Sequence, residues 1–513
     1  MLTKIASAAH FGLESVPITV EVNVFKKGFP GFNIIGLPNK AVDEAKERVK
    51  TALINSGIDF PTLKIIVNLA PADIPKEGSA YDLPIAIGIL NSLEIIKLPN
   101  EKSYFYGELS LDGTLRHTKG VLLLAIEARK NKVKNLFVPE DSSHEGAVVK
   151  EVNIYPVKSI TALISHLNDG AKIPKLKPKI GKTNSKRKFF VEFDFSEIIG
   201  QEQAKRALTI AASGGHNIFM QGPPGSGKTM LARAVPGILP DLLDEESLEV
   251  TKIYSIAALI SPGQSLIRTR PFRVVHHTTS RIGLIGGGSN PHPGEISLAH
   301  RGVLFLDEFP EFSRSCLESL RQPLEDGVVS ISRAAGSIKF PAEFMLIAAA
   351  NPCPCGYLGD PKRNCKCSPR SIMRYQSKLS GPLMDRIDLH INVPTVDVDK
   401  LINTEKIKTN IQNSQSIRKE VIRARKIQSD RFKKDKIFTN SDMKNKHIKK
   451  YCKLNPSGSL ILKQAVASFN LSARTYFRII KIARSIADLD NSNFIEDKHI
   501  AEALQYRVRT NIN

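Results

Sequence analysis

A glycine-rich loop with a lysine and a threonine, GPPGSGKT at residues 222–229, carries the clearest chemistry in the sequence. In a loop of the pattern G-x-x-x-x-G-K-[ST], backbone N–H groups surround the phosphates of a nucleotide, the lysine contacts the β- and γ-phosphate oxygens, and the hydroxyl binds Mg²⁺. The apolar residues 217–220 predict a strand before the loop, and residues 230–235 predict a helix whose N terminus faces the phosphates. The candidate residues for binding ATP and Mg²⁺ are Gly222, Pro223, Pro224, Gly225, Ser226, Gly227, Lys228 and Thr229.

Two adjacent carboxylates end an apolar run at residues 303–308, VLFLDE. The run predicts a buried strand, and a parallel sheet would place Asp307 and Glu308 at the same edge as the phosphate loop. There Asp307 would bind Mg²⁺ and Glu308 would polarise the attacking water, because phosphoryl transfer depends mainly on positioning and charge neutralisation. Alone, two acids after a strand often only begin a helix. Together with the loop, they predict ATP hydrolysis.

Four of the six cysteines lie close together in the sequence: Cys353, Cys355, Cys365 and Cys367. Two pairs of thiolates on one loop fit a tetrahedral structural zinc site. One residue separates the members of each pair, whereas a longer spacing is commoner in zinc sites, so reduced free thiols remain the alternative. Disulfides would be unusual in the cytoplasmic location that we expect.

The charge balance points to a polyanionic partner. The 513 residues include 73 lysines and arginines against 51 acidic residues, which gives a net charge of +22. Nucleic acid is the commonest partner of so basic a chain, although a compositional bias of the genome would give the same excess without a binding face. No apolar stretch is long enough to span a membrane, and the N terminus lacks the order of a signal peptide. We therefore expect a cytoplasmic protein with no membrane partner.

The first third of the chain predicts an α+β domain at residues 1–168. Strand-like runs at 18–24 and 64–69 flank a helical pattern at 41–57 that ends at a glycine. A linker at residues 169–190 follows, rich in lysine and interrupted by proline. A solvated connector is the simpler interpretation of the linker, and contact with a DNA backbone is the alternative.

The remainder predicts a motor and a lid, so the whole chain is expected to be an α/β multidomain protein. Residues 191–395 contain the phosphate loop and the acidic strand end, which indicate a parallel-sheet ATPase core. Residues 396–513 predict a helical lid, with Ser472 as the N-cap of a helix that has one apolar face.

The first domain resembles that of a known family. The stretches GFNIIGLPNKAVDEAKERVKTAL, VNLAPADIPKEGSAYDLPIAIGIL and FYGELSLDGTLRHTKGV are similar to the N-terminal domain of the bacterial ComM/YifB family of magnesium-chelatase-like AAA+ proteins. This resemblance implies a fold like the proteolytic domain of Lon, which is S5 domain 2-like. Ala80 and Val121 stand where Lon-type proteases have their serine and lysine, and Ser79 and Lys119 lie one and two residues away. We expect a binding or assembly module without peptidase activity, because such slips redirect both side chains.

The motor segment resembles AAA+ proteins of the chelatase and MCM helicase clade. Residues 193–202 are similar to the stretch that packs beside adenine, and Asn351 matches the sensor-1 position, although an Asn-Pro turn would explain it too. GPLMDRIDL at 381–389 resembles an arginine-finger motif, which implies that Arg386 contacts ATP in a neighbouring subunit of a ring, usually a hexamer; a surface arginine is the alternative. Arg474 resembles sensor 2.

Two insertions support this clade. Residues 271–295 are glycine-rich, contain three histidines and resemble the helix-2 insert of the clade, and we do not expect those histidines to bind a metal. Residues 327–340 predict a β-hairpin. In the clade such hairpins line the pore of the ring, which would place Arg333 and Lys339 against a DNA phosphate. An ordinary surface hairpin is the alternative.

The resemblance implies an ATP-dependent DNA translocase or helicase that promotes branch migration during homologous recombination of incoming DNA in natural transformation. DNA, further copies of the chain and recombination proteins would be its partners. A chelatase-like or protein-remodelling ATPase is the alternative, and a protease would need the two residues that Ala80 and Val121 replace.

Overall fold

The computed structural model describes residues 2–25, 29–36, 40–74, 76, 78–177, 192–288, 291–333, 336–396, 412–435 and 437–507. The chain forms two compact units. The first unit contains residues 1–186, 244–267 and 332–340, and the second contains 187–243, 268–331 and 341–513. The predicted motor segment 191–395 therefore contributes to both units. Most of the predicted linker lies outside the described residues.

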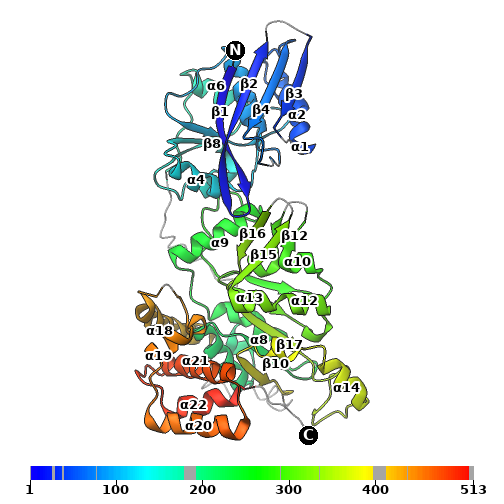
Figure 1. Cartoon of the computed structure of the whole chain (residues 1–513), viewed down its shortest axis with the longest axis vertical. Coiled ribbons are helices and arrows are strands. Elements are labelled where there is room, and N and C mark those ends of the chain that lie inside the picture. The colour runs from blue at the N-terminus through cyan, green and yellow to red at the C-terminus, as the bar shows by residue number, and fades with distance from the viewer. Residues whose placement is uncertain are drawn as a thin grey trace. The chain divides into compact units, whose positions relative to one another are not determined.

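A seven-stranded mixed sheet forms the centre of the first unit, in the order β3-β4-β2-β1-β5-β8-β9 (Figure 1). Neighbours β1–β2 and β2–β4 are antiparallel, and the other pairs are parallel. The strands are β1 Leu2–Phe11, β2 Glu14–Phe25, β3 Gly31–Ile35, β4 Lys64–Ala70, β5 Ser103–Phe105, β8 Asn135–Pro139 and β9 Asn153–Val157, with a small separate pair β6 Glu108–Leu109 and β7 Leu115–Arg116.

The alternating pattern of the first strands places one face of the sheet in the core. Val20, Val22 and Val24 on β2 are buried, while the polar residues between them are partly exposed, as the sequence predicted. Helix α3 packs against this face and is buried over Leu83–Leu90. Gly88 permits the close approach, because a Cβ there would lie 2.4 Å from Val22 Cγ2.

The helices of the first unit are α1 Lys40–Asp43, α2 Ala45–Asn55, α3 Asp82–Ser92, α4 Val121–Lys130, α5 Glu140–Gly146, α6 Ile160–Leu167 and α9 Asp244–Ile256. The helix expected over 41–57 is thus two helices, which meet at Glu44. Helix α9 comes from the predicted motor segment and packs with α4 in this unit. The Ser255 Oγ of α9 donates a 2.5 Å hydrogen bond to the buried Glu145 carboxylate.

A five-stranded parallel sheet forms the centre of the second unit, in the order β11-β14-β17-β10-β18. Its strands are β10 Ile218–Gln221, β11 Phe272–Val275, β14 Val303–Leu306, β17 Met345–Ala350 and β18 Leu389–Asn392. Every residue of β14 and β17 is buried, as expected for central strands covered on both faces. The strands predicted before the phosphate loop, before the two acids and before Asn351 are confirmed.

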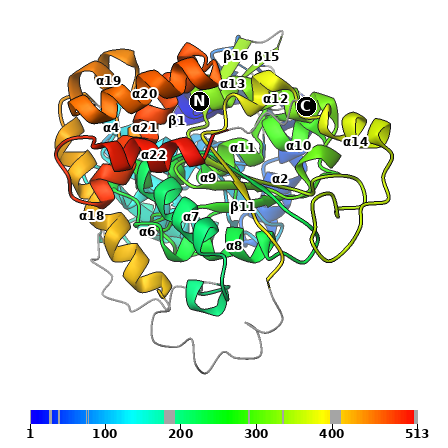
Figure 2. The same ribbon diagram turned by 90° about the horizontal axis from the view of Figure 1, so that it is seen from below.

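Short helices surround the sheet, and longer ones form the C-terminal region. Helices α18 to α22 lie together beside α7 (Figure 1 and Figure 2), which confirms a helical C-terminal region. The helices are α7 Glu202–Gly214, α8 Lys228–Ala234, α10 Arg281–Ile285, α11 Glu295–Leu298, α12 Arg314–Ser319, α13 Arg321–Asp326, α14 Pro369–Gln376, α15 Gly381–Met384, α18 Ser414–Phe432, α19 Asn445–Tyr451, α20 Pro456–Phe469, α21 Ala473–Leu489 and α22 Asp497–Gln505.

Two short two-stranded sheets complete the chain: β12 Gly286–Gly287 with β13 His292–Pro293, and β15 Val328–Arg333 with β16 Gly336–Pro341. The second pair is the hairpin that the sequence predicted. No helix in the described residues is both long and apolar enough to cross a membrane.

A buried ionic group holds the lid helices together. Asp488 of α21 is fully buried and binds Arg431 of α18, Arg484 of α21 and the amide of Asn440. Ser472 caps α21 by accepting a hydrogen bond from the Thr475 backbone at 3.2 Å, as predicted. Since a buried charge is stable only when it is paired, the Asp488 group fixes α18 and α21 in one arrangement.

Replacing Glu145 with Gln should remove a pH dependence of stability from the first unit. Burial raises the pKa of the Glu145 carboxyl from 4.5 to about 7. The folded state therefore binds the proton more tightly, and the stability that this confers is full below pH 4.5 and lost as pH rises through 7. We expect Glu145→Gln to be more stable than the natural protein by up to about 3 kcal/mol at pH 8, and little different at pH 4.5.

Urea unfolding followed by circular dichroism at both pH values measures this difference. Glu140→Gln on the same helix is the matched control, because the side chain of Glu140 is 49% exposed. A Glu145→Gln protein whose stability relative to the natural chain is the same at both pH values would contradict the prediction.

Candidate active site

The glycine-rich loop connects β10 to the first turn of α8 in the second unit. Gly225 and Gly227 have φ angles of 75° and 87°, left-handed values that glycine adopts without strain. Gly222 lies so close to the end of β18 that a Cβ would sit 2.1 Å from the Val393 carbonyl oxygen. Gln201, in the segment predicted to lie beside adenine, donates a 3.2 Å hydrogen bond to the Ser226 carbonyl. The loop is therefore held by its own glycines and by a neighbouring strand and helix.

The Lys228 ammonium lies inside the loop. It donates hydrogen bonds of 2.8 Å to the carbonyl oxygens of both Gly222 and Pro223. Burial lowers the pKa of Lys228, and the charge of Asp307 opposes that shift. The side chain of the predicted phosphate-binding lysine is therefore held by the loop itself.

A hydroxyl and a carboxylate meet at the carboxyl edge of the sheet. Thr229 Oγ1 donates a 2.7 Å hydrogen bond to Asp307 Oδ2. The two side chains come from α8 and from the end of β14, which the parallel sheet brings together. Both offer oxygen ligands, which Mg²⁺ prefers. The donor set that the sequence predicted for Mg²⁺ thus fits the ion.

Glu308 and Asn351 lie at the same edge. Asn351 follows β17, and its Oδ1 is 3.3 Å from Lys228 Nζ, which places the predicted sensor-1 residue beside the loop. Glu308 has a φ of 49°, a left-handed value that non-glycine residues seldom adopt. Its carboxylate lies 3.0 Å from His277 Nδ1. The sequence patterns did not connect His277 with the acidic strand end. Its position just after β11, the strand beside β14, could have indicated that it lies near Glu308.

Arg386 and Arg474 bind the same acidic residue and, in the described part of the chain, form no hydrogen bond with the phosphate loop. Both guanidinium groups bind the carboxylate of Glu325 on α13, Arg474 at 2.9 Å. Arg386 also donates a 2.6 Å hydrogen bond to the Pro382 carbonyl. Arg386 in particular lowers the pKa of Glu325. In the described residues, neither arginine hydrogen-bonds to Lys228, Thr229 or the two acids.

No motif or spacing in the sequence pointed to Glu325. It is one of two adjacent acids at the end of α13, and only its contacts with Arg386 and Arg474 distinguish it from Asp326. A further hydrogen bond connects α13 with α15, because Arg321 of α13 donates to the Ser380 hydroxyl at the start of α15, at 3.1 Å.

The candidate DNA contacts lie on the hairpin. Lys339 on β16 is exposed, while Ile331, Ile338 and Phe340 turn inward and are buried. Arg333 is the last residue of β15, and its side chain lies outside the described residues. These two positions stay predictions.

Apolar side chains occupy the positions where Lon-type proteases have their catalytic pair. Ala80 is 4% exposed and Val121 is fully buried, and both belong to one hydrophobic core. Ser79 donates its hydroxyl hydrogen to the Glu108 carboxylate. Packing, rather than an open site, therefore surrounds the two aligned positions.

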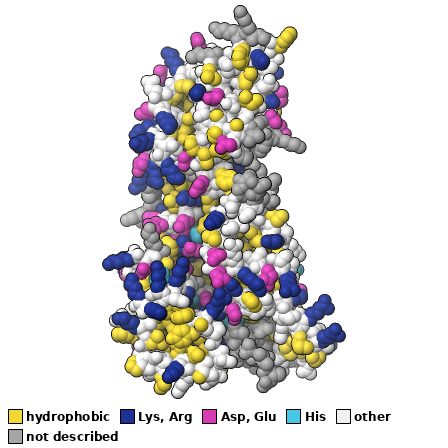
Figure 3. All heavy atoms as spheres, viewed as in Figure 1, with side chains coloured by type: hydrophobic (Ala, Val, Ile, Leu, Met, Phe, Trp, Pro, Cys, Tyr) yellow, Lys and Arg dark blue, Asp and Glu magenta, His cyan; other side chains and the backbone are white. Residues whose placement is uncertain are grey.

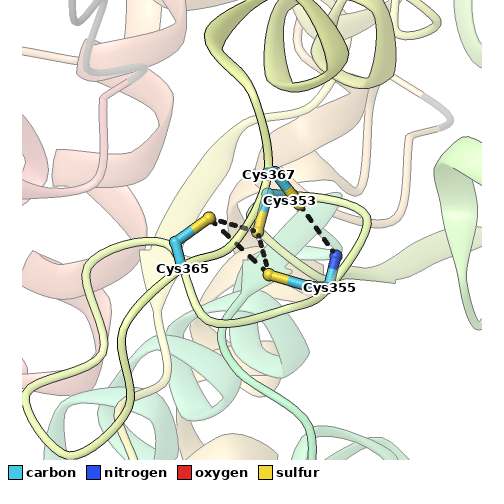
Figure 4. A group of neighbouring side chains, drawn as sticks. All are labelled: Cys353, Cys355, Cys365 and Cys367. Atoms are coloured by element: carbon cyan, nitrogen blue, oxygen red, sulfur yellow. Dashed lines mark hydrogen bonds between the residues drawn. The ribbon is translucent and has the colours of Figure 1, made fainter.

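The four cysteines predicted to bind zinc do come together. Cys353, Cys355, Cys365 and Cys367 point toward one another (Figure 4), and their sulfur atoms all lie within 4.8 Å of one another. Among the described residues, this is the one group of three or more His, Cys, Asp or Glu side chains that could hold a metal ion.

Comparison with known proteins gives the family. Models of Mg-chelatase subunit ChlI match residues 20–142 and 194–401, and a model of its C-terminal part matches 411–507. The chain is 43% identical to competence protein ComM of Haemophilus influenzae, over 99% of this chain and 97% of that one. The chain belongs to the ComM/YifB family of magnesium-chelatase-like AAA+ proteins.

Other members and relatives agree. Protein YifB of Escherichia coli is 41% identical over 99% of this chain and 97% of its own length. The magnesium-chelatase 38 kDa subunit of Cereibacter sphaeroides is 28% identical over 31% of this chain and 53% of its own. Membership in this AAA+ family indicates an ATPase, with ATP and Mg²⁺ as the ligands that suit Lys228, Thr229 and Asp307.

Replacing Glu325 with Gln should lower the turnover of ATP without weakening its binding. The neutral amide cannot hold two guanidinium groups as a carboxylate does, so Arg386 and Arg474 lose their common anchor. We expect kcat to fall by about tenfold and the KM for ATP to stay unchanged, since misplaced catalytic groups act on the transition state. Steady-state ATPase assays measure both constants.

The matched control is Asp326→Asn, which removes one negative charge from the next residue of the same helix. It should leave both constants at the natural values. If Glu325→Gln has the same kcat as Asp326→Asn, Glu325 does not position the arginines.

Proposed function

We propose that this protein is a ring-forming ATPase, a hexamer by analogy with its clade, that moves along DNA and promotes branch migration during recombination of incoming DNA in natural transformation. One observation carries the proposal of a ring. The phosphate-binding and acidic residues form one group, whereas Arg386 and Arg474 form another on Glu325. A nucleotide held by the first group receives its arginines from a second subunit.

Each residue of the site has a distinct part in hydrolysis. Lys228 and the loop N–H groups bind the β- and γ-phosphates, and Thr229 and Asp307 hold Mg²⁺. Glu308 polarises the attacking water after its carboxylate leaves His277, and Asn351 orients that water against the γ-phosphate. Arg386 of the neighbouring subunit then stabilises the charge that spreads over the transferring group.

Three features support DNA as the substrate. The net charge is +22, and the exposed Lys339 lies on a hairpin of the type that lines pores in the clade. The relative with 43% identity over nearly the full length is named a competence protein. The charge by itself is weak support, because Lys and Arg side chains are spread over the face drawn in Figure 3 with acidic side chains among them.

A chelatase-like or protein-remodelling ATPase is the second candidate, favoured by the chelatase family models. The chelatase subunit of Cereibacter sphaeroides matches only 31% of this chain, however, whereas ComM matches 99%. The full-length relationship is the reason that we prefer the DNA motor.

The ATPase rate with and without DNA tests the proposal. We expect single-stranded, duplex or four-way DNA to raise the rate several-fold, and Glu308→Gln to abolish hydrolysis in every case. Lys339→Ala should reduce the stimulation and leave the rate without DNA unchanged, because a hairpin lysine contacts only the phosphate backbone. Lys498→Ala, which removes an exposed lysine of α22, is the matched control.

A rate that no DNA changes would refute the DNA motor and favour the second candidate. If DNA stimulates the ATPase rate of Lys339→Ala as much as that of Lys498→Ala, Lys339 does not contact DNA.

A further inference from the structure

The four-cysteine group has the dimensions of a metal site. The Sγ of Cys353 lies 3.4 Å from that of Cys355 and 3.6 Å from that of Cys365, and Cys355 and Cys365 are also 3.6 Å apart. A disulfide would bring two sulfurs to about 2.05 Å, so these contacts are not bonds. Four thiolates around Zn²⁺ at about 2.3 Å have sulfurs about 3.8 Å apart, which is close to the observed spacing.

The surroundings of the sulfurs also suit a bound cation with thiolate ligands. The backbone N–H of Cys355 donates to Cys367 Sγ at 3.4 Å, the kind of bond that orients a metal ligand. Besides the cysteines, the same loop contains Lys362, Arg363 and Lys366 against a single acid, Asp360. These side chains sum to a charge of +2, which offsets the −2 of four thiolates and one Zn²⁺. Cys353 is buried, while the other three are half-buried and can be reached from solvent.

The segment between β17 and α14 has little else to order it. Residues 351–368 contain no helix or strand, and only Pro352, Cys353 and Gly356 are buried. A loop with so few buried apolar side chains gains little from the hydrophobic effect to offset its conformational entropy. A metal bound by four of its residues would supply that free energy, as in small metal-stabilised domains.

This segment touches the phosphate loop directly. Gly356 packs on Pro224 so closely that a Cβ on it would lie 2.5 Å from Pro224 Cδ. Asn351, which contacts Lys228, stands two residues before the first cysteine. On the other side of the segment, Gln376 of α14 donates a 3.2 Å hydrogen bond to the Pro352 carbonyl. The cysteine loop is therefore fixed to α14 at one side and to the nucleotide loop at the other.

We propose that Cys353, Cys355, Cys365 and Cys367 bind one Zn²⁺ ion, and that this metal braces residues 351–356 against the phosphate loop so that ATP binding depends on zinc. The ion takes no part in hydrolysis. It fixes Asn351 beside Lys228 and fixes Gly356 against Pro224. This inference goes beyond the proposed function, since it needs neither DNA nor a ring.

The metal content of the purified full-length protein tests the first half of the proposal. We expect one zinc per chain by plasma mass spectrometry, and less than half of that in Cys365→Ser. Cys316→Ala is the matched control, because Cys316 is a buried free cysteine outside the group, and it should keep its zinc. If Cys365→Ser contains as much zinc per chain as the natural protein, the proposed set of four ligands is wrong.

The affinity for a fluorescent ATP analogue tests the second half without DNA. Removal of zinc from the natural protein with a chelator should weaken binding by about tenfold, and added Zn²⁺ should restore it. Gly356→Ala should keep one zinc and still bind the analogue more weakly, because its φ of 87° and its contact with Pro224 exclude a Cβ. This variant separates the brace from the metal.

If the affinity for the ATP analogue is unchanged after zinc removal, or if Gly356→Ala binds the analogue as tightly as the natural protein, zinc does not support the phosphate loop. Circular dichroism of the stripped protein checks that it remains folded, and recovery on adding Zn²⁺ excludes irreversible damage. If ATP binding depends on zinc but DNA does not change the ATPase rate, the proposed DNA translocase is refuted. The proposed role of zinc in ATP binding is then still supported.

Discussion

The hydrogen bond between Thr229 and Asp307 is the contact on which the active site depends, and the parallel sheet makes it possible. β10, β17 and β14 are neighbours in that order, so the residues that follow them meet at one edge. Lys228, Thr229, Asp307 and Asn351 come from three separate stretches of sequence, and two hydrogen bonds link those stretches: Lys228 with Asn351 and Thr229 with Asp307. A shift in strand order would separate them.

A second set of charges fixes the helical lid and the arginine segment to that sheet. Asp388 is half-buried and stands two residues after Arg386; its carboxylate lies 3.0 Å from Arg478 Nε of α21 and 3.4 Å from His216 Nδ1. Burial alone would raise the pKa of Asp388, yet the bonds from His216 and the charge of Arg478 lower it to about 2. Through Glu325 and Asp388, the two arginines and helix α21 form one connected group, so movement of the lid would move the arginines with it.

The features that could be predicted from the sequence are those that a local pattern of residues specifies. The apolar runs before Gly222, Asp307 and Asn351 are strands, and the four cysteines meet, because motif spacing and hydrophobic pattern specify these features directly. The helix expected over 41–57 is observed as two helices that meet at Glu44, a division that the spacing of apolar residues does not reveal. Glu325 was missed because its contacts with Arg386 and Arg474 join distant segments, whereas His277 was missed although its place just after β11 could have indicated it. Assignment of α9 and of residues 332–340 to the first unit likewise depends on tertiary contacts.

The central claim is that each nucleotide site is completed by an arginine from another subunit, and a mixing experiment tests it most directly. Arg386→Ala and Glu308→Gln chains should each be inactive alone. Co-expressed with different tags and purified as mixed assemblies, they should recover part of the natural ATPase rate, because some interfaces pair an intact Glu308 with an intact Arg386. Mixed assemblies as inactive as either variant alone would contradict an arginine that acts across the interface.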